Sequence, residues 1–136
     1  MSRTLRLLPL LVLAACVSTS APADDVEQVT SESALVNWLG DHNYVVQQTG
    51  FSSLRLQGTL GTTYRISGFS SGALQAWTFG SEAEASRAVS ELRTRGGSQR
   101  RGFDTGLYQS GPLVVQFQGS DPGLRADLRD VLGSPR

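Results

Sequence analysis

The chain has 136 residues and a formal net charge of zero, because its 12 basic side chains balance its 12 acidic ones. This length suits one ordinary domain and is too short for two. Zero net charge gives no overall attraction for nucleic acid. All the basic residues are arginine, and the lack of lysine excludes Schiff-base, Ser-Lys and P-loop chemistry, since each needs a lysine amine.

Residues 1–15 have the layout of an export signal. Arg3 and Arg6 give a positive start, and an apolar run occupies 7–13, interrupted only by Pro9. A helix that spans a membrane needs about 20 apolar residues, and this run is much shorter. We therefore expect a signal peptide that is removed during export.

The only cysteine of the chain closes this segment, in the sequence Leu13-Ala14-Ala15-Cys16. These residues resemble the lipobox of bacterial lipoproteins, in which small side chains precede an invariant cysteine. The resemblance implies that the Cys16 thiol carries a diacylglyceryl group, that cleavage makes Cys16 the first residue of the mature chain, and that acyl chains hold it to the membrane. The alternative is a free buried cysteine, which gives no reason for the basic start and the apolar run before it.

The residue after Cys16 bears on location. It is Val17, and the absence of Asp there resembles lipoproteins that are passed on to the outer membrane. We therefore expect a lipid anchor in the bacterial cell envelope, with the outer membrane favoured if the cell has one. A lipidated Cys16 leaves no cysteine for a disulfide bond, so the fold has to rely on its apolar core.

A polar segment separates this anchor from the folded domain. Residues 16–30 are rich in Ser, Thr, Pro and Asp and bury too little surface to offset the loss of chain entropy. We expect a lipidated, flexible tether over 16–30 and a single domain over 31–136. The domain opens with a helix that begins at Thr30 or Ser31 and ends near Gly40. Its apolar stripe consists of Leu35, Trp38 and Leu39.

Three strands are expected after this helix. Alternation of apolar and polar residues predicts a strand over 44–49, whereas 51–61 fits either a weak strand or a loop. Two clearer strands, 62–67 and 73–79, are joined by the glycine-containing loop 68–72, which suits a hairpin.

Two further helices enclose a second hairpin. Ser81 and Glu84 form a capping box in which each side chain accepts from the other's backbone amide, and this helix ends at the glycine pair 96–97. The last helix has Asp121 as N-cap and Pro122 at its first position. The apolar stripes consist of Ala85, Ala88, Val89 and Leu92 in the first, and of Leu124, Leu128, Val131 and Leu132 in the second.

The second hairpin joins strands over 105–109 and 113–118 through a tight turn. Alternation in the second strand predicts which side chains are buried. Leu113, Val115 and Phe117 are expected to face the core, and Val114, Gln116 and Gln118 to face outward.

These elements predict an α+β fold of the order α-β-β-β-α-β-β-α. Short hairpins imply an antiparallel sheet of four to five strands, and helices with one apolar stripe each are expected to cover one face of it. The layout, with its last helix after a hairpin, resembles a group of small bacterial lipoproteins that have no assigned biochemistry. That resemblance implies no catalytic residues.

Two sets of residues carry side chains that could take part in catalysis. Gly68 to Gly72 matches G-x-S-x-G around Ser70, but a nucleophile elbow needs a helix after the serine and a histidine later in the chain. Asp41 and His42 are adjacent, and a carboxylate can orient an imidazole for base catalysis; both are also ordinary turn residues. With one histidine and a lipidated cysteine, no zinc site of the usual ligands is expected, and we expect no cofactor.

Four arginines, Arg93, Arg95, Arg100 and Arg101, lie close together in the sequence. They could bind lipid phosphates or an anionic glycan, because a guanidinium group matches phosphate with two hydrogen bonds. The simpler interpretation is a solvated loop with cations that favour a helix C-terminus.

The sequence therefore predicts a lipid-anchored envelope protein that binds an unidentified protein or envelope component without catalysis. The alternative is a small enzyme or ligand-binding domain with a site near Asp41, His42 and Ser70.

Overall fold

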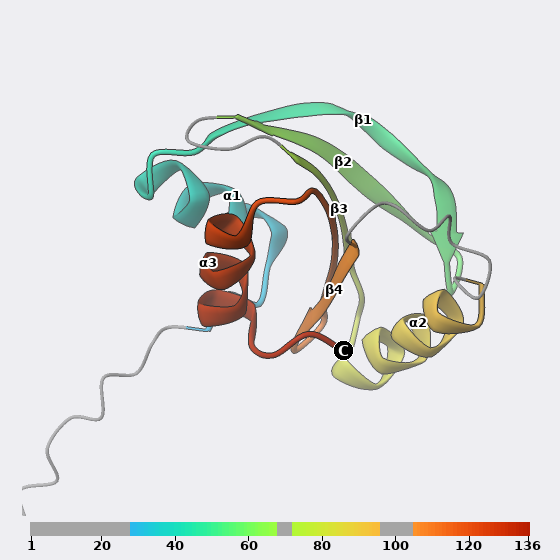
Figure 1. The fold of residues 1–136 in the computed structure, drawn as a ribbon. Helices are drawn as coiled ribbons and strands as arrows, with labels where there is room; N and C mark the ends of the chain where they lie inside the picture. The colour runs from blue at the N-terminus through green and yellow to red at the C-terminus, as the bar shows by residue number, and fades with distance from the viewer. Residues whose placement is uncertain (1–27, 68–71, 96–104) are drawn as a thin grey trace, which may run out of the picture.

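The computed structural model describes residues 28–67, 72–95 and 105–136. They form one antiparallel sheet of five strands in the order β1-β2-β3-β5-β4 (Figure 1). Three helices pack against it within the described ranges. The α+β class, the antiparallel sheet and the predicted element order are confirmed.

A long, curved hairpin forms one side of the sheet. β1 (Val45–Leu56) pairs with β2 (Thr59–Ser67), and two register shifts interrupt β1, which arches over the molecule in Figure 1. Gln57 and Gly58 connect the strands with φ values of 47° and 76°, the left-handed conformation that two-residue hairpin turns need. The segment 51–61 is therefore two strand ends and a tight turn.

The remaining strands place β5 inside the sheet. β3 (Gly72–Thr78) pairs with β2 on one side and with β5 (Leu113–Gln118) on the other. β4 (Thr105–Ser110) forms the edge next to β5, and their tight hairpin was correctly predicted. The loop between β2 and β3 lies outside the described residues.

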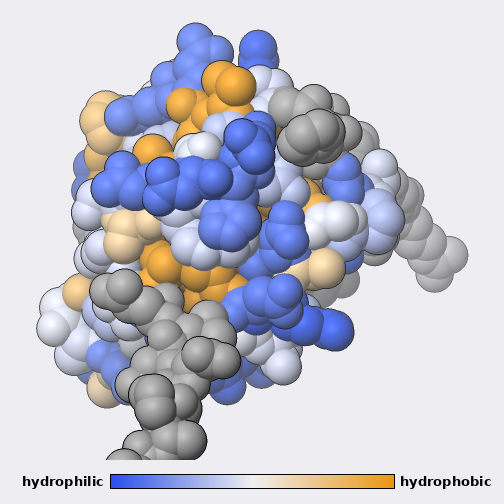
Figure 2. Space-filling view, turned by 90° about the vertical axis from the view of Figure 1, so that its left-hand side faces the viewer, coloured by the Kyte–Doolittle hydropathy of each residue, from blue (hydrophilic) through white to orange (hydrophobic). Residues whose placement is uncertain are grey.

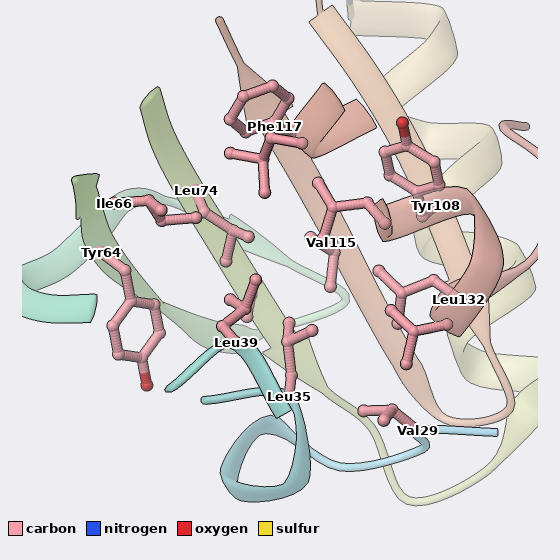
Figure 3. Close-up of a cluster of buried hydrophobic side chains, with 14 of the residues drawn as sticks. Val29, Leu35, Leu39, Tyr64, Ile66, Leu74, Tyr108, Val115, Phe117 and Leu132 are labelled. Carbon is pink, nitrogen blue, oxygen red and sulfur yellow. The ribbon is translucent and has the colours of Figure 1, made fainter. Parts of the chain in front are cut away.

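Two helices cover one face of this sheet. In α1 (Glu32–Asp41) the Ser31 side chain caps the first turn, and in α3 (Pro122–Leu132) Asp121 accepts from two backbone amides. Their apolar side chains pack with alternate residues of the strands into the larger core, shown in Figure 3. That core contains Leu35, Leu39, Tyr64, Ile66, Leu74, Val115, Phe117, Leu124, Leu128 and Leu132 among others.

The third helix, α2 (Glu82–Arg95), covers the opposite face, so the expectation that all helices lie on one face is wrong. Trp77 and Val114 point to α2, whereas their neighbours Ala76 and Val115 belong to the larger core. Successive side chains of a strand point to opposite faces, and both faces of the central strands are apolar. Val114 and Gln116, expected outside, are therefore buried.

The start of α2 differs in one detail from the predicted capping box. The hydroxyl of Ser81 accepts from the amide of Glu84 at 3.2 Å, as expected. The Glu84 carboxylate accepts from the amide of Gly80 at 3.1 Å, one residue before the expected donor. Among the helices in the described ranges, none is both long and apolar enough to span a membrane.

Candidate functional site

Asp41 and His42 lie at the exposed end of α1. The His42 ring stacks on Trp38, with ring centroids 3.8 Å apart and planes inclined by 23°. Its Nδ1 donates to the Trp38 carbonyl oxygen at 2.8 Å. That nitrogen is therefore used to close the helix, and Asp41 does not orient the ring through it.

A groove runs beside the outer side of α1, where residues 28–31 enter the domain. It measures about 460 Å³, and Trp38 and Asp41 contribute to its lining, as do Val29 and Ala34. Figure 2, which views the molecule from the side of α1 and α3, shows apolar patches among mostly hydrophilic side chains. The structure thus places Asp41 at a groove, while Ser70 of the same predicted site lies outside the described residues.

The arginines near the end of α2 are placed only in part. Arg93 and Arg95 are exposed in the last turn of the helix. Arg95 forms an ion pair of 2.5 Å with Glu91. Arg100 and Arg101 lie outside the described residues, so the four-arginine anion site stays a prediction.

Glu91 also connects α2 to the first hairpin. Its carboxylate accepts from the backbone amide of Gln57 at 3.2 Å and from the side-chain amide at 2.8 Å. These hydrogen bonds, with the charge of Arg95, lower the pKa of Glu91. Glu91 therefore holds the β1–β2 turn against the helix.

Two tyrosines of the larger core donate hydrogen bonds to helix carboxylates, which the sequence did not predict. The Tyr44 hydroxyl donates to Asp127 in α3 at 2.7 Å, and the Tyr64 hydroxyl donates to Glu32 in α1. Burial, together with the acceptor Asp127, raises the pKa of Tyr44 to about 12. Burial and Glu32 likewise raise the pKa of Tyr64. These pairs are far apart in the sequence, so only the fold identifies them.

A depression of about 250 Å³ lies between β4 and α3. The sequence did not predict it. Tyr108, Arg125 and Arg129 provide its polar groups, and Pro122, Ala126 and Pro135 provide its walls. The spacing of the arginines by four residues places them on one helix face and was readable from the sequence. Tyr108 joins them only because β4 lies beside α3.

The remaining predicted site residue, Cys16, lies outside the described residues. Within those residues, no group of three or more His, Cys, Asp or Glu side chains is arranged to hold a metal ion. Comparisons of the chain with protein-family models, with curated proteins and with solved structures found no significant match in any of the three.

Proposed function

We propose that this protein is a lipid-anchored binding domain of a bacterial cell envelope. The observation that carries the proposal is Leu13-Ala14-Ala15-Cys16, preceded by a basic start and an apolar run. Acyl chains on Cys16 supply the membrane affinity, since each buried CH₂ contributes about 0.8 kcal/mol and stable attachment needs two chains. The segment 17–27, rich in Ser, Thr, Pro and Asp, then separates the lipid from the folded domain, whose larger core already includes Val29.

A non-enzymatic role is supported by what the chain offers for catalysis. It has no lysine and one histidine, and Nδ1 of that histidine closes α1. The groove beside α1 and the depression between β4 and α3 are lined by side chains that can contact a ligand. The partner we propose is a protein or another envelope component; nucleic acid is disfavoured because the chain has a small acidic excess once Arg3 and Arg6 are removed with the signal peptide.

Lipidation is tested by metabolic labelling with a palmitate analogue and by mass spectrometry of the full-length protein. We expect label and added lipid mass on the normal protein and neither on Cys16→Ser. The matched control is Cys16→Ser combined with Ser18→Cys, which keeps a thiol but moves it out of the motif and should also lack lipid. An unlipidated normal protein would contradict the anchor.

The destination is tested with Val17→Asp in a cell that has two membranes. We expect the normal protein in the outer-membrane fraction and the variant shifted to the inner membrane, both with lipid on Cys16. Equal distribution of the two proteins would remove the reason for favouring the outer membrane.

The second candidate is a small enzyme or ligand-binding domain near Asp41, His42 and Ser70. The observation that favours it is the groove beside α1, to which Asp41 contributes. Crosslinking in intact cells, followed by capture of the acylated protein, distinguishes the candidates. A partner that is retained by His42→Ala supports the binding domain, whereas a turnover activity that His42→Ala abolishes supports the enzyme.

A further inference from the structure

The depression between β4 and α3 combines one buried phenol with two guanidinium groups. Arg125 and Arg129 lie one turn apart on α3, and Tyr108 reaches the same space from β4. Figure 3 shows the Tyr108 hydroxyl at the end of the ring that points away from Leu132. Pro122, Ala126 and Pro135 surround these groups with apolar surface.

Two carboxylates at α3, those of Asp121 and Asp127, accept hydrogen bonds away from the depression. Asp121 accepts from the amides of Gly123 and Leu124 at the start of the helix. Asp127 accepts from Tyr44 in the larger core. Thus the polar side chains lining the depression are cations and a hydroxyl, and none is an anion.

The arginines differ in how they are held. Nε of Arg125 donates to the Gly119 carbonyl oxygen at 3.2 Å, which fixes the guanidinium group beside the depression. Arg129 is exposed, and within the described ranges it forms no ion pair with a carboxylate. One guanidinium group is therefore positioned by the fold, and the second is available to a ligand.

Tyr108 supplies a third hydrogen-bond donor to the depression. Its side chain is only 1% exposed, and no residue of the described part accepts a hydrogen bond from its hydroxyl. Burial raises the pKa of Tyr108 although the two arginines act in the opposite direction, so the phenol is protonated at neutral pH and can donate.

We propose that this depression binds an oxyanion of the phosphate type, with Arg129, Arg125 and the Tyr108 hydroxyl as donors. Guanidinium groups bind phosphate oxygens with two parallel hydrogen bonds, and such charge-assisted bonds are the stronger ones. Pockets for drug-sized ligands measure roughly 300–1,000 Å³, so a volume of about 250 Å³ fits one phosphate group better than a large ligand.

Phosphate binding in this depression does not depend on the lipid anchor. The donors recognise the same phosphate oxygens in a free ion and in a lipid headgroup. Failure of lipidation at Cys16 and failure of phosphate binding are separate results, since the first is read by mass and the second by titration.

The test is a titration of the full-length protein with inorganic phosphate, followed by the amide NMR signals of β4 and α3. We expect saturable shifts that sodium chloride at the same ionic strength does not produce. Arg129→Gln should weaken binding by about tenfold or more, as for the loss of one hydrogen bond to a charged group. Tyr108→Phe should weaken it by roughly threefold to tenfold.

Two variants keep the result interpretable. Arg87→Gln removes an exposed arginine from α2 on the opposite face and should leave phosphate binding unchanged. Ala126→Glu keeps every arginine but introduces a carboxylate at the exposed wall of the depression, and it should abolish binding. Equal shifts with chloride, or full affinity in both Arg129→Gln and Ala126→Glu, would overturn the proposal.

A second arm identifies the source of the phosphate. Binding to vesicles of phosphatidylglycerol in phosphatidylcholine that requires Arg129 and is displaced by inorganic phosphate supports the pocket with a lipid headgroup as its ligand. Saturable phosphate binding that requires Arg129, without such vesicle binding, supports the pocket with a soluble ligand.

Discussion

On the sheet face covered by α1 and α3, tyrosine hydroxyls donate to carboxylates of the helices, whereas on the α2 face the polar contacts use an amide. Tyr44 and Tyr64 bond Asp127 and Glu32 on the first face. On the second face, the Gln109 side chain donates to the Glu82 carbonyl oxygen and to Ser86. The tyrosine contacts are lost when the phenols ionise, whereas the Gln109 contacts do not titrate, so alkaline pH should act on the two faces unequally.

The apolar contacts of the two faces also differ. The α2 face is the smaller, with Ala85 and Ala88 fully buried under the helix and Trp77 filling the space between helix and sheet. Small helix residues allow a close approach, and Trp77 is the largest side chain of this face. Each face carries one tryptophan, Trp77 under α2 and the half-buried Trp38 on α1, and each can report on its own face.

The largest expected effect comes from Trp77→Ala. It should lower the free energy of unfolding by about 3–5 kcal/mol, as truncation of a fully buried aromatic does. Denaturant unfolding followed by the fluorescence of Trp38 measures it. The matched variant Trp38→Ala removes a half-buried side chain and should cost clearly less. Equal losses in the two variants would show that the α2 face does not depend on Trp77.

Two glycine substitutions compare the faces directly. A Cβ at Gly61 would lie 2.4 Å from Nε1 of Trp77, and a Cβ at Gly72 would lie 2.3 Å from Cε2 of Phe117 in the larger core. Because each ring has to move, each change to Ala should cost about 1–3 kcal/mol, typical of overpacking. Thermal unfolding measures both.

The control for this pair is Gly40→Ala, since nothing lies within 4 Å of a Cβ at Gly40. It should unfold at the same temperature as the normal protein or slightly above it. Chemical shift changes should stay near Trp77 in Gly61→Ala and near Phe117 in Gly72→Ala. Changes that spread over both faces would mean that the two cores respond as one.

Alkaline pH should weaken the α1/α3 face. The folded-state pKa of Tyr44, about 12, and that of Tyr64 lie above the unfolded value of about 10. Their contribution is therefore complete below pH 10 and is lost as the pH rises above it, through about 12 for Tyr44, at up to about 1.4 kcal/mol per pH unit for each tyrosine. Urea unfolding between pH 8 and pH 11 measures this, with no lysine titrating in that range.

The matched variant is Tyr44→Phe with Tyr64→Phe. Each change should cost about 1–2 kcal/mol at pH 8, the size of a hydrogen bond to a charged group that is partly exposed. The double variant should also lose much of the alkaline slope, leaving the part due to Tyr108. An unchanged slope would show that these tyrosines do not control the response.

The smallest effect is expected at the exposed ion pair between Glu91 and Arg95. Arg95→Gln should change the unfolding free energy by less than about 0.5 kcal/mol, because exposed pairs are screened by water and salt. Melting at low and high salt measures it. Glu91→Gln should cost more, since it also weakens the contacts with Gln57, and the reverse order would contradict the role given to Glu91.

Local chemistry accounts for the parts of the fold that were predicted well. The α3 helix is confirmed with its Asp121 cap, its Pro122 and its four buried apolar residues, because capping and helical spacing are decided within a few residues of each other. The β4–β5 hairpin is confirmed for the same reason. The Gln57–Gly58 turn was missed, since a glutamine with positive φ has no strong turn signal.

The candidate sites also combine features that the sequence predicts with features that only the fold brings together. The spacing of Arg125 and Arg129 could be read from the chain, but their meeting with Tyr108 could not. The Asp41–His42 pair is adjacent in the sequence, yet the ring nitrogen bonds the Trp38 carbonyl oxygen, because a helix end offers an acceptor at close range. Adjacency therefore did not establish a catalytic pair.

The order of helices and strands, the helix caps and the predicted lipid attachment at Cys16 all follow from patterns a few residues long, because each depends on neighbours in the chain. Which helix covers which face required the tertiary structure. A central strand such as β5 is apolar on both sides, with Val114 under α2 and Val115 under the other helices. Alternation identifies two sets of side chains but not the helix that each set meets, since that depends on strand order and on the twist of the whole sheet.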